Sequence, residues 1–442
     1  MTRGLGGLLI SFIAAGGALL LGLAGATLRT GRLDPLDWLF PAIFAFAGLT
    51  LWAGRGGQAM SWTRSGIIWA VVTLPPLLFI VWAGMRAPVT GMVLLACLLG
   101  LAMVGVRLGQ AFSLARRFVL LSAMIVAALL VPRLVDAGRG YGALPDTPRP
   151  IVAVLSALPL QGIPMGAALG LPAAESIGLR SPIWAALEER IDLRALDGLD
   201  DKGLAGVKRL LLAQPRALAP AELVALDAWV RSGGEAVILS DPLLQWPDPR
   251  PLAHPARAPL TSLLDPLLTH WRLRLESAEF SLEADATERR ALASGAMVQL
   301  AGASRFTTIE NGSACALSDA DLIARCRIGA GSALLMADAD WINDTLWTLS
   351  PGQPQDRRAR TSDAVALLDA WLRADDVAAD RWATWVASEG AVIAGLRAAL
   401  ILILLLALGE WVLTRRPSLS QRRREINIDQ TGNINKTSQE AG

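Results

Sequence analysis

The sequence predicts a membrane α-helical bundle combined with an α/β domain that has a flavodoxin-like, mostly parallel sheet. Hydrophobic residues make up 53% of the 442 residues and charged residues only 18%, which is little charge for a water-soluble chain of this length. Apolar runs long enough to cross a bilayer lie towards the two ends, and short apolar runs alternate with helix patterns between them. The first pattern is typical of membrane spans and the second of βαβ units.

Six apolar runs approach the ~20 residues that a helix needs to cross a bilayer. They cover residues 5–28, 37–53, 66–84, 88–106, 118–134 and 393–413. The second run contains Pro41 and the third contains Pro75 and Pro76, which neighbouring helices can accommodate in a membrane. The lipid bilayer is therefore the first predicted partner.

Arginines predict the orientation of these spans, because positive residues favour the cytoplasmic side. If six helices alternate, one side carries Arg3, Arg55, Arg64, Arg107, Arg116, Arg117 and the arginines of 415–424, and the other carries Arg29, Arg32 and Arg86. This predicts a multi-pass protein of a bacterial inner membrane with both termini inside and the long middle segment in the periplasm. A signal peptide cleaved near 24–26 is the alternative for the first run, and it leaves the middle segment on the same side.

The predicted domains follow this order. They are five spans over 1–136, a periplasmic α/β domain over 146–386, a last span over 391–414 and a cytoplasmic tail over 415–442. The tail is first basic and then polar, which predicts disorder. In the last span Arg397 and Glu410 lie near opposite ends, so we expect both side chains to reach the membrane interface, and a buried functional charge is the alternative.

Residues 209–242 carry the clearest α/β pattern. The apolar run 210–213 predicts a strand that is buried on both faces. Pro220 suits a first helical turn, Gly233-Gly234 ends the helix, and 236–239 predicts the next strand. Apolar residues recur at helical spacing between them: Leu223, Leu226 and Val230. Such a βαβ unit has parallel strands and a right-handed crossover.

The rest of the middle segment shows the same periodicities. Strands are predicted at 151–155, 298–300, 305–309 and 332–336, an antiparallel hairpin at 315–317 and 322–327, and helices at 182–190, 261–270 and 363–372. Together these elements predict an open sheet with helices on both faces.

Acidic residues follow two of the predicted strands. Asp241 ends one strand, and four candidates follow another: Asp338, Asp340, Asn343 and Asp344. Ligands of open α/β sheets bind at the carboxyl ends of the strands, so these five are candidate ligand-binding residues. The alternative, which we favour, is that they cap the turns and helices that follow.

The sequence lacks the motifs of metal-binding, nucleotide-binding and catalytic sites. Asn343 and Leu349 stand where an EF-hand has Gly and Glu, and neither His254 nor His270 has a metal-ligand spacing. The sequence has no Walker, dinucleotide or G-x-S-x-G motif. We therefore expect no metal, no cofactor and no catalytic residue. A net charge of +2 gives no indication of nucleic-acid binding.

Two cysteines lie on the two arms of the predicted hairpin. A turn at 320–321 would place Cys315 opposite Cys326. An oxidising periplasm allows a structural disulfide there, and a pair of free thiols is the alternative.

The opening strand–helix–strand unit also resembles the external domain of the GldG family, auxiliary membrane subunits of ABC-type transport systems first associated with gliding motility. The shared pattern is an apolar strand, LAPAEL at 218–223 with ALD at 225–227, Gly233-Gly234, and a strand ending in Asp241-Pro242. Asp338 and Asn343 are similar to a pair after that domain's closing strand. The resemblance is good over this unit, looser over 140–375 and absent from the first five predicted spans.

The resemblance implies a glutamine-amidotransferase-like domain. Amidotransferases need a Cys nucleophile on an elbow after a strand, whereas Gln214-Pro215 follows the strand here. The implied protein is non-enzymatic, and its partners are the permease and ATPase subunits of an ABC-type transporter. Two other functions remain open: an envelope scaffold or sensor that signals through the tail, and a hydrolase that uses the aspartates.

Overall fold

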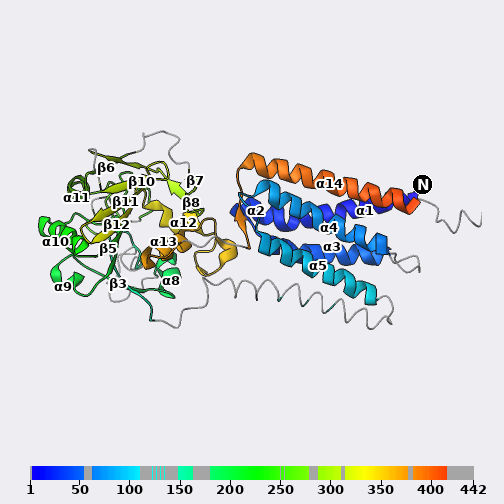
Figure 1. Cartoon of the computed structure of the whole chain (residues 1–442), viewed down its shortest axis with the longest axis horizontal. Helices are drawn as coiled ribbons and strands as arrows, with labels where there is room; N and C mark the ends of the chain where they lie inside the picture. Colours follow the sequence, from blue (N-terminus) through cyan, green and yellow to red (C-terminus); the bar gives the residue numbers. More distant parts are fainter. Residues whose placement is uncertain are drawn as a thin grey trace, which may run out of the picture. The chain divides into compact units, whose positions relative to one another are not determined.

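The computed structural model describes most of the chain. The described residues are 2–53, 62–109, 148–162, 180–248, 250–252, 254–277, 287–309, 314–376 and 382–415, with 122, 126, 130 and 134. The chain divides into two compact units, one formed by Met1–Val135 with Asp380–Gly442 and the other by Asp136–Ala379. The first unit is helical and the second is α/β (Figure 1).

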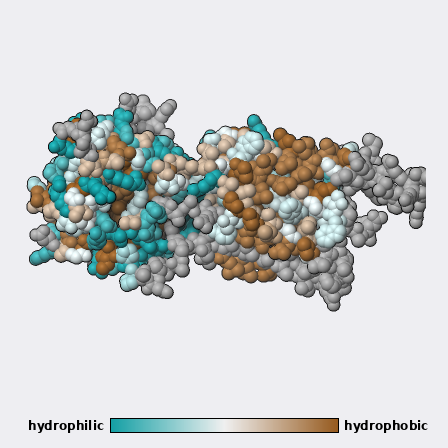
Figure 2. Space-filling model, viewed as in Figure 1, coloured by the Kyte–Doolittle hydropathy of each residue, from teal (hydrophilic) through white to brown (hydrophobic). Residues whose placement is uncertain are grey.

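The helical unit contains long apolar helices. They are α1 (Thr2–Ala18), continued by η1 (Leu19–Ala24) and α2 (Gly25–Thr30), then α3 (Leu39–Ala53) after η2 (Pro35–Trp38), α4 (Trp62–Ala83), α5 (Val89–Gly109) and α14 (Glu389–Arg415). Among the described residues, three stretches are long and apolar enough to cross a membrane: Gly6–Thr30, Ser65–Ala83 and Glu389–Val412. Hydrophobic residues form large patches on the visible face of this unit (Figure 2). The structure thus agrees with membrane association.

Three of the six predicted spans correspond to these long stretches, and the other three do not. The runs at 37–53 and 88–106 correspond to the shorter apolar helices Pro35–Thr50 and Val89–Gly105. The run at 118–134 lies outside the described residues apart from isolated positions. Pro75 and Pro76 lie within α4, which continues through them.

One prediction for the last helix is wrong. Glu410 is only 6% exposed, and its Oε2 accepts a hydrogen bond of 3.1 Å from the Oγ of the buried Ser11. The carboxyl group therefore lies between α14 and α1 and does not reach outward, because a buried hydroxyl offers it a partner. Arg397 is exposed.

A small strand pair joins two connections of the helical unit. β1 (Arg32–Leu33) pairs in antiparallel fashion with β13 (Thr384–Trp385). On the other side, the Met85 amide donates to the Trp385 carbonyl at 2.9 Å. Gly84 is required here, because a Cβ at this position would come within 2.7 Å of the Thr384 side chain.

The α/β unit is built on a seven-stranded sheet in the order β10-β11-β12-β5-β4-β2-β3. The strands are β2 (Ile151–Ser156), β3 (Asp192–Ala195), β4 (Arg209–Ala213), β5 (Glu235–Leu239), β10 (Cys315–Ser318), β11 (Ile323–Ile328) and β12 (Gly331–Met336). All neighbours from β3 to β12 are parallel, and β11 and β10 add an antiparallel edge. The sheet is therefore mixed but mostly parallel, as the sequence predicts.

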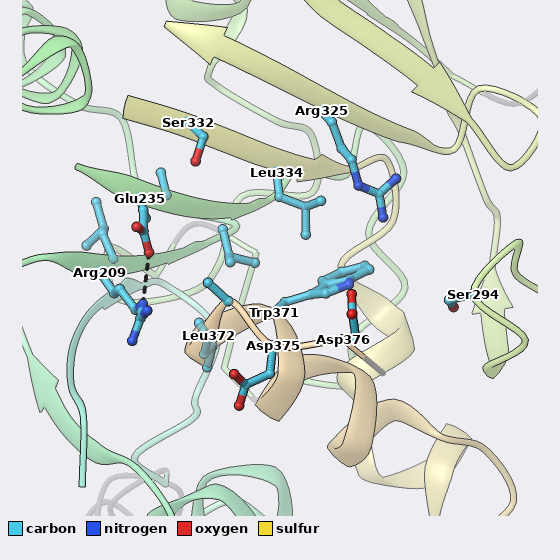
Figure 3. A pocket seen from close by; sticks show the side chains of 14 residues that line it. Arg209, Glu235, Ser294, Arg325, Ser332, Leu334, Trp371, Leu372, Asp375 and Asp376 are labelled. Atoms are coloured by element: carbon cyan, nitrogen blue, oxygen red, sulfur yellow. Dashed lines mark hydrogen bonds and ion pairs between the residues drawn. The ribbon is translucent and has the colours of Figure 1, made fainter. Parts of the chain in front are cut away.

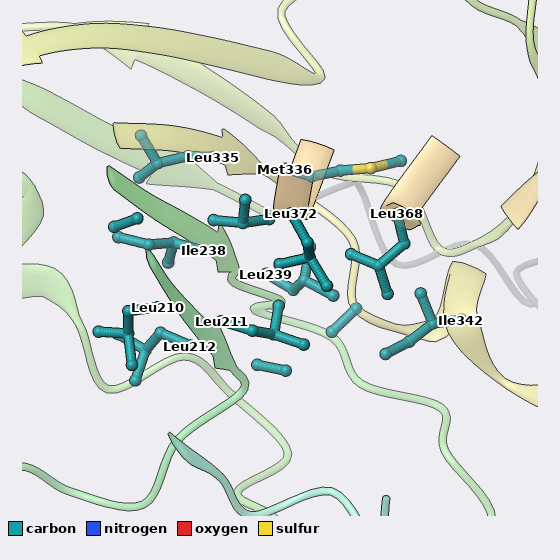
Figure 4. Close-up of a cluster of buried hydrophobic side chains, with 14 of the residues drawn as sticks. Leu210, Leu211, Leu212, Ile238, Leu239, Leu335, Met336, Ile342, Leu368 and Leu372 are labelled. Carbon is teal, nitrogen blue, oxygen red and sulfur yellow. The ribbon is translucent and has the colours of Figure 1, made fainter. Parts of the chain in front are cut away.

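Helices pack against the buried strands. They are α8 (Pro182–Glu188), α9 (Asp201–Leu204), α10 (Pro220–Arg231), α11 (Asp265–His270), α12 (Asp344–Trp347) and α13 (Ala364–Arg373). Leu368 and Leu372 of α13 lie near Leu239 and Leu211 in the core (Figure 4). Helix α11 begins at Asp265, not at 261, because Pro266 suits a first helical turn.

Two predicted strands lie outside the main sheet. β8 (Met297–Ala301) pairs with β7 (Thr287–Ala291), and β9 (Arg305–Thr308) pairs with β6 (Leu273–Glu276). Both are separate two-stranded antiparallel ribbons.

Candidate functional site

Three of the five candidate residues converge at the carboxyl ends of β5 and β12. One carboxyl oxygen each from Asp241, Asp338 and Asp340 lies within 4.8 Å of the others. The three residues are 0%, 0% and 1% exposed. The strands β5 and β12 are adjacent in the sheet, which explains why acidic residues so distant in sequence meet.

Backbone amides already occupy most of these carboxyl oxygens. Asp241 accepts from the amides of Leu243 (2.8 Å) and Ala339 (3.0 Å). Asp338 accepts from the amides of Ala301 and Trp341, both at 3.0 Å, and Asp340 accepts from that of Gln245 at 2.6 Å. The carboxyl groups thus connect the loops that follow β5 and β12 with the end of β8.

Burial changes the protonation of this cluster. It raises the pKa of Asp241 to about 6 and that of Asp340 to about 8, and it raises the pKa of Asp338 well above its usual range. The negative charge of Asp241 raises the pKa values of the other two further. The Oδ1 of Asp340 is buried and accepts no hydrogen bond from any described residue. A proton on this atom would provide a donor to a neighbouring carboxylate.

The other two candidates have a different role. The Oδ1 of Asn343 accepts from the amide and hydroxyl of Thr345, both at 3.1 Å, and so caps α12. Asp344 stands in the first turn of that helix. The predicted five-residue site therefore separates into a sealed carboxyl cluster and a helix cap.

Gln214 stands at the position where the resemblance to amidotransferases predicts a nucleophile. It directly follows β4 with φ of 39°, a left-handed conformation that is strained for a residue other than glycine. Its side chain is fully buried, and its Nε2 donates to the carbonyls of Asp241 (2.8 Å) and Pro259 (2.9 Å). Its Oε1 accepts from the Asp241 amide at 2.9 Å. The amide group at this position is therefore fixed inside the protein.

An open cleft lies beside this elbow. The chain passes from β2 to β3 and then returns past β2 to β4, so the strand order reverses between β2 and β4. Ligands of open α/β sheets bind outside the carboxyl ends of strands at such a reversal. A cleft of about 340 Å³ lies there, lined by Ser156–Gly162, Trp184, Ala195–Asp197, Arg216, Arg250, Pro255 and Ala256 among others. We call it the switch-point cleft.

Both arginines of the switch-point cleft have acidic partners. Arg216 binds both carboxyl oxygens of Glu222 at 2.9 Å, and this pairing lowers the pKa of Glu222 to about 2. Arg250 binds Asp248 at 2.6 Å through Nη2, and it lowers the pKa of that carboxyl. The guanidinium charges are thus neutralised in place.

A second hollow of about 360 Å³ lies at the amino ends of β4, β5 and β12. In Figure 3, Trp371 and Leu372 of α13 line it together with the Arg209–Glu235 pair, whose N–O distance is 2.9 Å. It lies at the edge opposite to the one that open α/β sheets use for ligands.

Cys315 and Cys326 are directly opposite each other on β10 and β11 and are joined by a disulfide in the structure. This bond joins β10 to β11 at the antiparallel edge of the main sheet. Neither the carboxyl cluster nor the switch-point cleft contains it.

No protein-family model and no curated protein matches the sequence. Solved structures similar to parts of it include an exo-β-1,4-mannosidase from an Opitutaceae bacterium, with a TM-score of 0.28 and 12% identity over 57% of this chain and 39% of that one. A β-galactosidase from Bacillus circulans has a TM-score of 0.26 and 11% identity over 44% and 29%. A cytoplasmic protein from Salmonella typhimurium LT2 has a TM-score of 0.30 and 9% identity over 51% and 99%. The chain spans less than half of either glycosidase, and similarity this low carries no conclusion about function.

Proposed function

We propose that this chain is a non-enzymatic integral membrane subunit of an ABC-type transport system. The observation that carries the non-enzymatic part is Gln214, since a buried, hydrogen-bonded amide stands at the elbow where the resemblance to amidotransferases requires a nucleophile. The sealed carboxyl cluster supports the same conclusion, because its oxygens are engaged by backbone amides.

The α/β unit is the ligand- or partner-binding domain in this proposal. The first of its parallel strands lies between the second and the third, an order that supports a flavodoxin-like fold. We place this unit in the periplasm of a bacterium and both chain ends in the cytoplasm. The distribution of arginines and the disulfide in the α/β unit support that orientation.

Affinity purification from native membranes in mild detergent, followed by mass spectrometry, tests the transporter role. We expect an ABC-type ATPase and its permease to be recovered at stoichiometric levels. A tagged membrane protein of unrelated fold, expressed at the same level, is the control for non-specific capture. Recovery of envelope-assembly proteins alone would contradict the proposal and favour the scaffold.

A phosphatase reporter that is active only outside the cytoplasm tests the orientation. We expect activity when it is fused after Gly162, within the α/β unit, and no activity when it is fused after Arg415. The reverse result would place the α/β unit in the cytoplasm.

A further inference from the structure

We infer that the switch-point cleft binds an uncharged, polyhydroxylated ligand of one or two sugar units. This inference rests on the proposed binding role of the α/β unit and specifies its site and ligand class. It moves the site away from the aspartates that follow β5 and β12 to the loops that follow β2, β3 and β4.

The cleft has the size and access that the carboxyl cluster lacks. Its volume of about 340 Å³ falls in the lower part of the ~300–1,000 Å³ range of small-molecule sites. Ala195, Asp197 and Ala256 on its walls are exposed, whereas every member of the carboxyl cluster is buried. The described lining residues therefore leave part of the cleft open to solvent.

The polar groups of the cleft include both donors and acceptors that have no protein partner. Among the described residues, none accepts a hydrogen bond from Nη1 of Arg250 or Nε of Arg216, whose other nitrogens hold their acidic partners. The side chains of Asp197 and Gln161 likewise form no hydrogen bond with a described residue. Vicinal hydroxyl groups, which both donate and accept, match such a mixture.

The charge balance disfavours an anionic ligand. Glu222 neutralises Arg216 and Asp248 neutralises Arg250, and Asp197 adds one further carboxylate. A phosphate or carboxylate ligand would have to compete with these fixed pairs. A neutral ligand would instead be oriented by the paired guanidinium groups without displacing their partners.

The cleft also has apolar surface that a sugar ring requires. Val154, Leu158 and Trp184 line it together with prolines and alanines from the flanking loops. Polar atoms nevertheless form the larger share of the exposed lining of the cleft. The non-polar faces of pyranose rings match the apolar part of this lining, and the ring hydroxyls match the larger polar part.

Saturation-transfer difference NMR on the full chain in detergent tests the inference. The probes are maltose and N,N′-diacetylchitobiose, with trialanine and succinate as non-saccharide probes. We expect transfer to the ring protons of at least one disaccharide and none to succinate. Ala195→Trp and Ala256→Trp fill the cleft from exposed positions, so each should weaken binding by about tenfold or more. Ala291→Trp, at an exposed residue of β7, should bind as the wild type does.

Three outcomes would overturn the inference: no transfer to either disaccharide, transfer that survives both filled variants, or preferential binding of trialanine or succinate. The proposed function is tested separately, because the filled variants should still recover the ATPase and permease. Loss of saccharide binding with intact complex formation supports both proposals. Intact saccharide binding without any transporter partner would overturn the transporter role alone.

Discussion

Asp340→Asn should make the α/β unit less sensitive to alkaline pH. In the folded protein burial raises the pKa of Asp340 from 3.8 to about 8. The native state therefore keeps this proton up to a pH at which the unfolded chain has lost it, so stability falls as pH rises from about 4 to about 8. Asparagine is neutral throughout and retains an oxygen that can accept from the Gln245 amide.

The size of the effect follows from the width of this pH window. Each pH unit over which only the native state holds the proton costs about 1.4 kcal/mol of unfolding free energy. Between pH 6 and pH 8, Asp340 alone should therefore remove roughly 3 kcal/mol from the wild type. Asp241 has a pKa of about 6, so its own effect on the unfolding free energy falls mainly below pH 6.

Chemical unfolding of the purified protein in detergent, monitored by tryptophan emission at pH 6 and pH 8, measures this difference. We expect the midpoint of the wild type to fall at pH 8 and that of Asp340→Asn to fall less, because Asp338 keeps its own raised pKa in the variant. Asp321→Asn, at an exposed carboxyl in the β10–β11 turn, is the matched control and should behave as the wild type does. A wild type that becomes more stable at pH 8, or a variant with the wild-type slope, would refute the argument.

Three further predictions concern Gln214, the hydrogen bond between Glu410 and Ser11, and the disulfide. Gln214→Ala removes three hydrogen bonds of a buried side chain and should lower the unfolding free energy by roughly 2–4 kcal/mol. Gln214→Asn is one methylene shorter and should recover little of this stability. Wild-type stability in Gln214→Ala would contradict the prediction. A double-mutant cycle of Glu410→Ala and Ser11→Ala should show a coupling of about 0.5–1.5 kcal/mol in detergent unfolding, and strict additivity would count against the interhelical bond. Cys315 and Cys326 should react with a maleimide only after reduction, and replacing both by serine should cost about 2–3 kcal/mol. Because Cys97 is free, the labelled positions must be mapped by mass spectrometry, and alkylation at 315 or 326 in the unreduced, denatured protein would show free thiols there.

The unit from β4 to β5 could be predicted almost entirely from local sequence. Its continuous apolar runs, Pro220 and Gly233-Gly234 specify a strand, a helix and a strand, and the structure has all three within one residue of the expected limits. Strand β3 was missed because its four residues, Asp192–Ala195, include two charged side chains and no apolar run. Apolar patterning predicts a strand only where the strand is buried.

Pairing partners were harder to predict than the strands themselves. The segments at 298–300 and 305–309 are strands, but they pair with β7 and β6 and not with the main sheet. Neither of those partners was predicted, and periodicity in one segment contains no information about which distant segment supplies its hydrogen bonds.

The meeting of the aspartates could be predicted from the sequence, whereas the contacts that seal the cluster could not. The meeting of Asp241 with Asp338 follows from adjacent parallel strands whose carboxyl ends share one edge. The sealing of that edge depends on amides from Leu243 and Gln245, which belong to a loop without a periodic pattern, and from Ala301 at the end of β8, a strand outside the main sheet. The switch-point cleft combines three such loops, and the one available signal was the Ser156–Gly162 stretch after the first strand of the sheet.

The pairing of strand β13 determines how a pulling force on the chain would reach α14. It lies between the α/β unit and α14, and it is held by β1 on one side and by Met85 on the other. Tension applied to the chain at residue 382 would load these hydrogen bonds in shear before it reached the first turn of α14 at Glu389. The load would thus be shared between the connections that follow α2 and α4, so α14 would not be pulled as an isolated tether.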